Sequence, residues 1–395
     1  MSNKNWIYSK RSVRMKSSVI RELLKVTKKP GVISFGGGLP APELFPAKEI
    51  SEIATKILKE NPGNALQYGT TEGYPPLREG LAKRMKTIGV DCDPDQILIT
   101  GGSQQGLDII GRVFLDVGSP IITSRPTYLG AIQAFNAYNP EYLTLPSDEN
   151  GMVVDGLEEM VKKNSPRIIY LVPTYQNPDG RTIPEDRRKE ILRIAEEYNV
   201  PVIEDDPYSE LCFEGSIPEH MISMAPENVI LLGTFSKLLA PGLRIAWAIT
   251  PKGYCYDRFV KMKQGMDLHT NTFGQHIIAE FLKTGVLDSH LKKIKEEYAR
   301  RRNTMVECMH KYFPEDVTFT EPTGGLFLWV TLPEKINTTE LLPTAVEKLV
   351  AYVPGSAFYP GGGGHNTMRL NYSFSSSEKI EEGIKRLGKL FKEAL

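Results

Sequence analysis

Lys237 lies in an unusual setting, within the stretch LLGTFSKLLAPGLRIAW at residues 231–247. It follows the hydroxyl residues Thr234 and Ser236 and precedes Arg244, and the flanking apolar runs are typical of buried strands. A lysine between buried strands is costly unless a nearby group interacts with it. Because hydroxyls and an arginine suit a phosphate, the stretch predicts a phosphate site in which Lys237 is either a clamp or a Schiff-base nucleophile. A P-loop is not indicated, since the pattern G-x-x-x-x-G-K-[ST] does not occur.

The stretch ITGGSQQGLDII (99–110) is a second candidate for phosphate binding. An apolar strand pattern is followed by two glycines and by Ser103, which opens a helical pattern. Glycines let the backbone approach a ligand, and a helix N-terminus offers free N–H groups to a phosphate. The alternative is that Ser103 only caps the helix, because serine is a common N-cap residue.

Two more polar clusters follow predicted strands. In VIEDDPYSEL (202–211), Asp205 and Asp206 end an apolar run. An acidic pair suits a metal, but the chain offers no obvious histidine partner, and a solvated turn is the alternative. In LVPTYQNPDG (171–180), Asn177 lies among prolines and a glycine, where turn formation alone would account for it. No metal site is predicted.

The elements that must position these residues read as an α/β sheet. Nearly continuous, β-branched apolar runs suit strands that are buried on both faces. The runs are 97–100, 120–123, 167–172, 200–205, 229–233 and 244–250. Helical patterns lie between some of them, at 103–116, 155–163 and 184–198. Alternating strands and helices predict a three-layer α/β domain with a mostly parallel sheet, whose ligands bind at the carboxyl ends of the strands.

The C-terminal part of the chain has a different pattern. A long, heavily charged helical pattern covers 287–312. Three further strands and two further helices are expected after it, at 325–332, 351–354, 368–374, 338–349 and 376–393. This mixture predicts a smaller α+β domain. Near the N-terminus, residues 14–27 read as one amphipathic helix, with Val19, Leu23 and Val26 at helical spacing.

Composition and charge exclude several classes of protein. Lys+Arg and Asp+Glu both number 48, so the chain lacks the basic footprint of a nucleic-acid binder or of a protein that binds anionic membranes. The four cysteines are scattered without a C-x-x-C pair, which argues against a zinc site and a disulfide framework. The N-terminus has no apolar core of a secretory signal, and no apolar stretch approaches a membrane span. A cytoplasmic protein is expected.

Taken together, five ordered motifs resemble those of the class I aminotransferases, which are pyridoxal-phosphate (PLP) enzymes of fold type I. The motifs are GGSQQ, NPDG, EDDPY, TFSK with PGLR, and MRLNY, and they extend over nearly the whole chain. Within the family, the 2-aminoadipate and kynurenine aminotransferase branch is most similar, through four segments at 37–46, 66–79, 102–108 and 264–271. Asp179 is a departure, since the N-P-x-G loop commonly carries threonine there.

The resemblance implies roles around the cofactor ring. Lys237 would form the internal aldimine with PLP. Asp205 would pair with the ring nitrogen, because an ionised carboxylate keeps that nitrogen protonated and the ring able to accept electrons. Asn177 and Tyr208 would hydrogen-bond the 3′ oxygen, and Tyr128 would stack on the ring. Lys237, Asp205 and Tyr208 are the predicted catalytic residues.

The resemblance also implies a phosphate-binding set and a second subunit. The residues expected at the phosphate are Gly102, Ser103, Gln104, Ser236 and Arg244, with Thr234 as a further candidate. Tyr68 is similar to a tyrosine that reaches the phosphate from the neighbouring subunit, which implies a homodimer with composite sites. A cis peptide is expected before Pro178, since X–Pro bonds adopt this form at modest cost.

Four residues are expected at the substrate. Arg369 resembles the arginine that grips the α-carboxylate through a two-pronged salt bridge, and Asn177 and Gly37 would lie beside it. Arg21, on the predicted N-terminal helix, occupies the place from which an arginine binds the distal carboxylate in the 2-aminoadipate branch. The alternative for Arg21 is a solvated helix residue that pairs with Glu22.

The implied reaction is a two-stage amino transfer from an L-2-amino acid to 2-oxoglutarate. The donor would be 2-aminoadipate, an aromatic or a branched-chain amino acid. Residues 1–45 would form an N-terminal helix and substrate-covering part of the small domain, 46–290 the large PLP-binding domain and 291–395 the C-terminal small domain. One alternative is a PLP-dependent lyase or synthase of the same fold. Another is a MocR-like regulator, which the sequence disfavours because the aminotransferase pattern begins near residue 14.

Overall fold

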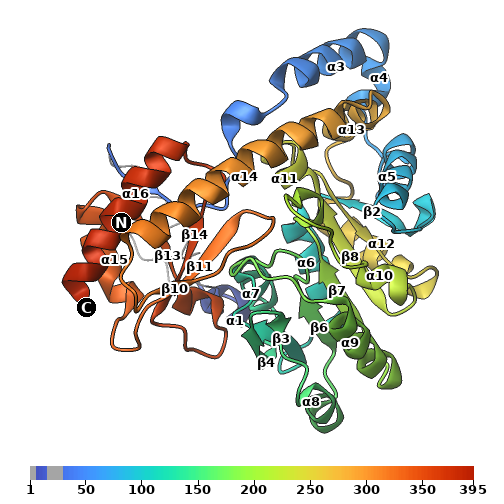
Figure 1. Ribbon diagram of the computed structural model, residues 1–395. Helices are drawn as coiled ribbons and strands as arrows, with labels where there is room; N and C mark the ends of the chain where they lie inside the picture. Colours follow the sequence, from blue (N-terminus) through green and yellow to red (C-terminus); the bar gives the residue numbers. More distant parts are fainter. Residues whose placement is uncertain (1–5, 16–29) are drawn as a thin grey trace.

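The computed structural model describes residues 6–15 and 30–395. An eight-stranded sheet forms the centre of the larger part of the molecule (Figure 1). In the order in which they pair, its strands are β2 (Ile97–Thr100), β9 (Ala246–Ile249), β8 (Val229–Thr234), β7 (Val202–Asp205), β6 (Ile168–Leu171), β3 (Pro120–Arg125), β4 (Glu141–Asp148) and β5 (Gly151–Met152). The neighbours from β8 to β4 are parallel, whereas β9 is antiparallel to both β2 and β8. The predicted fold class, with its mostly parallel sheet, is confirmed.

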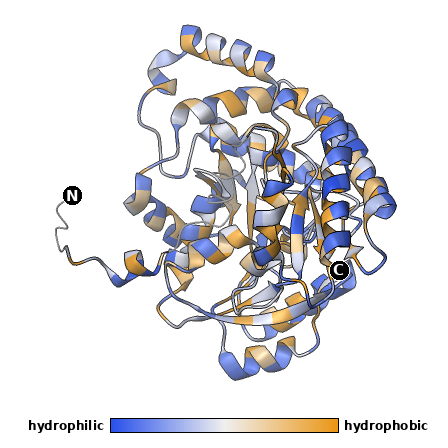
Figure 2. Ribbon diagram, turned by 90° about the vertical axis from the view of Figure 1, so that its left-hand side faces the viewer, coloured by the Kyte–Doolittle hydropathy of each residue, from blue (hydrophilic) through white to orange (hydrophobic). Residues whose placement is uncertain are grey.

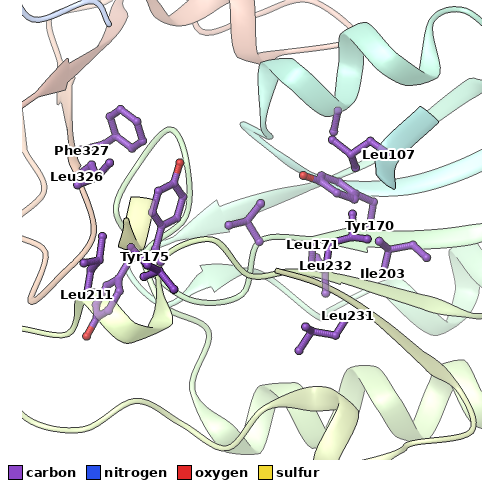
Figure 3. Packing of buried hydrophobic residues seen from close by; sticks show 14 of the residues in the cluster. Leu107, Tyr170, Leu171, Tyr175, Ile203, Leu211, Leu231, Leu232, Leu326 and Phe327 are labelled. Atoms are coloured by element: carbon purple, nitrogen blue, oxygen red, sulfur yellow. The ribbon is translucent and has the colours of Figure 1, made fainter. Parts of the chain in front are cut away.

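Helices cover both faces of the sheet because its central strands are apolar on both sides. Strands β2, β6, β7 and β8 are buried along their whole length. Helix α6 (Ser103–Phe114) packs on β8 and β9, next to α7 (Leu129–Phe135) and α12 (Tyr254–Asp267). Figure 3 shows Leu107 of α6 above the sheet and Leu231 below it. On that lower side lie α8 (Leu157–Asn164), α9 (Glu185–Glu197) and α10 (Met221–Met224).

The chain enters the large part through helices that pack beside the sheet. These are α3 (Ala47–Glu60), α4 (Pro62–Ala65) and α5 (Pro75–Thr87), and they pack against α13 (Thr272–Lys283). Hydrophobic residues gather on the inner strands and polar residues on the outer helix faces (Figure 2). Within residues 6–15 and 30–395, no helix is long and apolar enough to cross a membrane.

A smaller α+β unit follows α14 (Val286–Tyr312), a long helix that runs from one part of the molecule to the other (Figure 1). Its antiparallel sheet has the order β10 (Thr318–Phe319), β11 (Phe327–Thr331), β14 (Thr367–Asn371) and β13 (Val353–Pro354). Its helices are α15 (Thr338–Glu347) and α16 (Ser377–Ala394). The N-terminal strand β1 (Ile33–Ser34) pairs in parallel with β12 (Val350–Ala351), so the N-terminal segment joins this unit.

The expected helix over residues 14–27 falls almost entirely outside the described residues. Among those described near the N-terminus, α1 (Lys10–Arg14) is a short helix capped by Ser9. The guanidinium of Arg11 lies 5.1 Å from the centre of the Tyr138 ring, which places α1 against the large part of the molecule.

Candidate active site

A pocket opens at the edge of the large sheet where its parallel strands end. Loops that follow β2, β3, β6, β7 and β8 all reach this edge, because these strands point in the same direction. Its lining residues are Ser103, Gln104, Tyr128, Val172, Asn177, Asp205, Pro207, Tyr208, Thr234, Ser236, Lys237, Pro241 and Arg244. The structure therefore brings most of the residues predicted for the cofactor to one place.

One corner of the pocket is suited to an anion. Helix α6 starts at Ser103, directly after Gly102, whose positive φ of 97° turns the chain into the helix. The Ser103 hydroxyl is buried and has no hydrogen-bond partner among the described residues. Arg244 lies next to Gly102 and donates a hydrogen bond of 3.2 Å to the Gly101 carbonyl. A free helix N-terminus, an unpaired hydroxyl and a guanidinium together form a cradle for a phosphate.

The opposite wall of this corner comes from the end of β8. The Thr234 hydroxyl oxygen accepts a 3.1 Å hydrogen bond from the Ser236 N–H and so caps the short helix α11 (Phe235–Leu238). The two hydroxyl oxygens lie 3.0 Å apart. This local cap turns the chain from β8 into the pocket and places Lys237 on the turn of helix that follows.

Asp205 offers one free carboxylate oxygen to the pocket. The residue is only 1% exposed at the end of β7. Its Oδ2 atom accepts a 2.7 Å hydrogen bond from the Tyr170 hydroxyl, whereas Oδ1 is buried and has no partner in the described part of the chain. Burial raises the pKa of Asp205 to about 7; the Tyr170 hydrogen bond lowers it and the nearby charge of Asp206 raises it further. A cationic N–H in the pocket would satisfy Oδ1 and favour the ionised carboxylate.

Lys237 is a usable nucleophile in this setting. Its Nζ atom donates a 2.7 Å hydrogen bond to the main-chain oxygen of Gly38. Burial, followed by the positive charges of Arg369 and Arg244, lowers the pKa of Lys237 to about 8. A larger share of neutral amine is therefore present near neutral pH than for an ordinary lysine, and only the neutral amine attacks a carbonyl carbon.

Two phenols and an amide form the middle of the pocket. The Asn177 side-chain nitrogen lies 3.5 Å from the Tyr208 hydroxyl. Burial raises the pKa of Tyr208 strongly, so this hydroxyl, which accepts from the Asn177 nitrogen, stays protonated and keeps its own proton for donation. Burial likewise raises the pKa of Tyr128 to about 12. Tyr128 is the N-cap residue that directly precedes α7, and Tyr208 packs edge-on against Phe327 of the small unit, with ring centres 5.9 Å apart.

Arg369 is fully buried beside the pocket, and the partners of its guanidinium among the described residues are an amide oxygen and a main-chain oxygen rather than a carboxylate. Its terminal nitrogens donate to Oδ1 of Asn177 at 2.8 Å and to the Gly36 oxygen at 2.7 Å, whereas Nε has no partner within residues 6–15 and 30–395. The guanidinium lies 4.2 Å from the centre of the Phe327 ring and 5.2 Å from that of Phe358. Burial lowers its pKa to about 10. A buried, flat cation of this kind suits a ligand carboxylate.

The remaining predicted residues differ in their placement. Gly102 adjoins Arg244 behind the phosphate cradle. Gly37 lies between the two glycines whose oxygens accept from Arg369 and Lys237. Tyr68 is 79% exposed, is not among the lining residues, and contacts His269 edge-on at 5.6 Å between ring centres. Arg21 lies outside the described residues.

The expected cis peptide before Pro178 is wrong. Within the described residues, the cis peptide bond is the one between Arg125 and Pro126, directly after β3. It therefore lies in the loop that carries Tyr128, not in the loop that carries Asn177.

Sequence reasoning missed several residues that shape the pocket. Val172, Pro207 and Pro241 line it, and Tyr170 contacts Asp205. In the sequence, Tyr170 belongs to the apolar run 167–172 and resembles a core residue. The sequence holds no local signal for this contact: only the register of the structure, in which Tyr170 pairs with Ile203, two positions before Asp205, places Tyr170 on the same face of the sheet as Asp205.

The residues of the pocket fit PLP. Among the described residues, the Ser103 hydroxyl in the phosphate cradle and Oδ1 of Asp205 are buried without partners, and Lys237 lines the same pocket. PLP carries a phosphate for the cradle, a basic ring nitrogen for Oδ1 of Asp205 and an aldehyde for Lys237.

The comparisons with known proteins agree with this geometry. A family model described as aminotransferase class I and II matches residues 41–387. The chain is 45% identical to aromatic-amino-acid aminotransferase 1 of Thermococcus litoralis, over 98% of this chain and 94% of that protein. It is 44% identical to the 2-aminoadipate transaminase of Thermus thermophilus, over 98% and 96%. The solved structure of the kynurenine aminotransferase of Pyrococcus horikoshii, a complex with PMP, KYN and KYA, matches with a TM-score of 0.94 and 45% identity, over 98% of this chain and 97% of that one.

Proposed function

Because this chain belongs to the class I and II aminotransferases, we propose that it transfers the amino group of 2-aminoadipate, or of an aromatic or branched-chain amino acid, to 2-oxoglutarate. One observation carries the proposal. Lys237 and Asp205 line a single pocket, and Arg369 adjoins it through its hydrogen bond to Asn177. A nucleophilic amine, a partner for a ring nitrogen and a carboxylate receptor are the groups that amino transfer needs.

The chain is a PLP-dependent enzyme, as are the members of its family. When bound, the cofactor supplies an electron sink that stabilises negative charge at the Cα atom of the substrate. The N-terminus of α6, Ser236 and Arg244 would hold its phosphate, and Oδ1 of Asp205 would face its ring nitrogen. Asn177 and Tyr208 would hydrogen-bond the oxygen on the ring, and Tyr128 would stack on its face.

Lys237 also serves as the base in this proposal. Its neutral amine takes the proton from the substrate Cα atom, and the ammonium that results returns a proton later in the reaction. An ordinary lysine is a poor match for both tasks near neutral pH, because it is almost fully protonated. Burial and the two nearby arginines lower the pKa of Lys237 to about 8, which brings both protonation states within reach.

Arg369 orients the substrate. Its guanidinium is fixed between the rings of Phe327 and Phe358 and by Asn177, so little side-chain freedom is lost when a carboxylate binds. A carboxylate there would replace the Gly36 oxygen as the acceptor. Since Asn177 contacts both Arg369 and Tyr208, it links the substrate end of the pocket to the cofactor end.

The identity of the amino donor rests on the relatives and on Arg21. The two proteins named for 2-aminoadipate and aromatic substrates are similarly close to this chain. We expect Arg21 to bind the distal carboxylate of 2-aminoadipate. Rates with 2-aminoadipate, glutamate, leucine, phenylalanine and kynurenine, each with 2-oxoglutarate, test the assignment. Release of ammonia and pyruvate from a β-substituted amino acid without a 2-oxo acid would point to a lyase instead.

A matched variant tests the role of Arg21. Arg21→Ala should raise the KM for 2-aminoadipate and leave that for leucine unchanged, because only the first substrate has a distal carboxylate. Unchanged kinetics with both substrates would remove Arg21 from the site.

We also propose a homodimer with composite sites. Tyr68 is too exposed to belong to the pocket of its own chain, and Leu66, two positions earlier, is 65% exposed as well. Large apolar and aromatic side chains that are exposed close together in the sequence are consistent with a surface that a partner covers. In this arrangement the Tyr68 hydroxyl reaches the phosphate in the partner subunit.

A further inference from the structure

Tyr170 has a single hydrogen-bond partner among the described residues, and that partner is Asp205. Tyr170 lies in the middle of β6 and is fully buried. Its hydroxyl donates to Oδ2 of Asp205 at 2.7 Å. The ring is held edge-on against Phe135, with centres 5.6 Å apart, and lies next to Leu107 (Figure 3). The Tyr170 side chain therefore has little freedom to move, and its hydroxyl is held in place against Asp205.

This hydrogen bond gives the two carboxylate oxygens of Asp205 different surroundings. One oxygen is occupied by Tyr170, and the other is buried without a partner and faces no donor of the described residues. A buried carboxylate with no hydrogen-bond donor on either oxygen can rotate, or it can take up a proton because burial disfavours its charge. A carboxylate with one oxygen held presents the other in a fixed direction.

We propose that Tyr170 is a positioning residue for the cofactor: its hydroxyl holds Oδ2 of Asp205, so that Oδ1 is presented, ionised, to the ring nitrogen of PLP. The inference rests on the proposed function of the pocket. Tyr170 does not touch the substrate or the cofactor in this scheme, and it acts only through Asp205.

The electrostatics of the site agree with this role. Burial is the largest influence on Asp205 and raises its pKa, and the hydrogen bond from Tyr170 is what opposes that rise. Burial and the charge of Asp205 raise the pKa of Tyr170 well above its ordinary value, so the phenol remains a donor. The neighbouring carboxylate cannot substitute for Asp205, because Asp206 accepts from the N–H and hydroxyl of Ser209.

The test uses the full-length protein freed of its cofactor and two probes that differ at one ring atom. The first probe is pyridoxamine 5′-phosphate, and the second is its analogue with carbon in place of the ring nitrogen. Tyr170→Phe removes only the hydroxyl. We expect this variant to bind pyridoxamine 5′-phosphate about tenfold more weakly than the wild type, as for a lost hydrogen bond to a charged group, and to bind the carbon analogue with wild-type affinity.

Tyr352→Phe is the matched control. Tyr352 is also fully buried, and its hydroxyl donates to the Thr338 carbonyl in the small unit, 2.8 Å away. The Tyr352→Phe variant should bind both probes with wild-type affinity. The proposal would be overturned if Tyr170→Phe weakened the binding of both probes equally or the binding of neither, since an effect through Asp205 must depend on the ring nitrogen. The proposed function is judged separately, by amino transfer in the wild type, so one can fail without the other.

Discussion

The Nζ atom of Lys237 donates a hydrogen bond to the main-chain oxygen of Gly38, 2.7 Å away. The oxygen of Gly36 accepts an equally short bond from Arg369. Residues 36–38 therefore contact both cations of the site, although they lie far from them in the sequence. In the proposed binding mode, a substrate carboxylate at Arg369 would compete with the Gly36 oxygen for the guanidinium.

The reactivity of Lys237 should report its lowered pKa. Burial and the charges of Arg369 and Arg244 favour the neutral amine, so the midpoint of reactivity should lie near pH 8. This midpoint can be measured in the cofactor-free protein. A small neutral reagent acylates Lys237, and mass spectrometry follows the rate of this acylation across a range of pH. Removing a neighbouring positive charge with Arg369→Gln should move the midpoint upward. A midpoint near 10.5 in the wild type would contradict the described environment.

Arg369→Lys should impair substrate binding more than cofactor binding. Lysine keeps the charge but loses the two-pronged grip on a carboxylate and the flat contact with the Phe327 ring. We expect kcat/KM to fall on the order of 10²-fold, mainly through KM, with an unchanged affinity for PLP. Arg112→Lys, on the surface of α6, is the control and should change neither. A loss confined to PLP affinity would place Arg369 at the cofactor instead.

Gly102→Ala should weaken PLP binding. A Cβ atom at position 102 would overlap the guanidinium of Arg244, and φ there is 97°. Arg244 must then move away from the phosphate cradle, and we expect about tenfold weaker binding of PLP. Gly118→Ala is the matched control, since φ is 82° and the added atom meets open space. It should cost about 1 kcal/mol of stability from backbone strain and leave PLP affinity intact. Equal affinities for PLP in Gly102→Ala and Gly118→Ala would argue against phosphate binding beside Gly102.

Mixing two defective variants tests the composite site. Lys237→Ala lacks the nucleophile, and Tyr68→Phe lacks the hydroxyl proposed to reach the partner's phosphate. A mixed dimer has one site with Lys237 from one chain and Tyr68 from the other. After dissociation and random reassociation, about a quarter of all sites should be intact, and PLP affinity at those sites should match the wild type. If no high-affinity sites appeared in a mixture that forms dimers, Tyr68 would act within its own chain or not at all.

The sheet and the convergence of the site were predictable because they follow local patterns. The apolar runs at 97–100 and 229–233 are strands β2 and β8 within one residue at either end. Parallel strands end at one edge, so the polar residues after them had to meet there. The helix expected over 287–312 is α14, Val286–Tyr312, since its charged and apolar residues keep helical spacing throughout.

Other features could not be read from local patterns. Strand β4 (Glu141–Asp148) mixes polar residues and Pro146 with its apolar ones, because it lies near the edge of the sheet, and it was not expected. The pairing of Ile33 with Val350 joins distant segments and has no local signal. Tyr170 resembles a core residue in the sequence, and only the register of β6 on β7 shows that its hydroxyl meets Asp205.

The central claim is that Lys237 carries amino transfer in a PLP pocket. The most direct measurement compares the wild type with Lys237→Ala, both loaded with PLP, in the formation of glutamate from 2-oxoglutarate and 2-aminoadipate or an aromatic amino acid. We predict glutamate formation by the wild type and none above background by Lys237→Ala. Glutamate formation at the wild-type rate by Lys237→Ala would contradict the account.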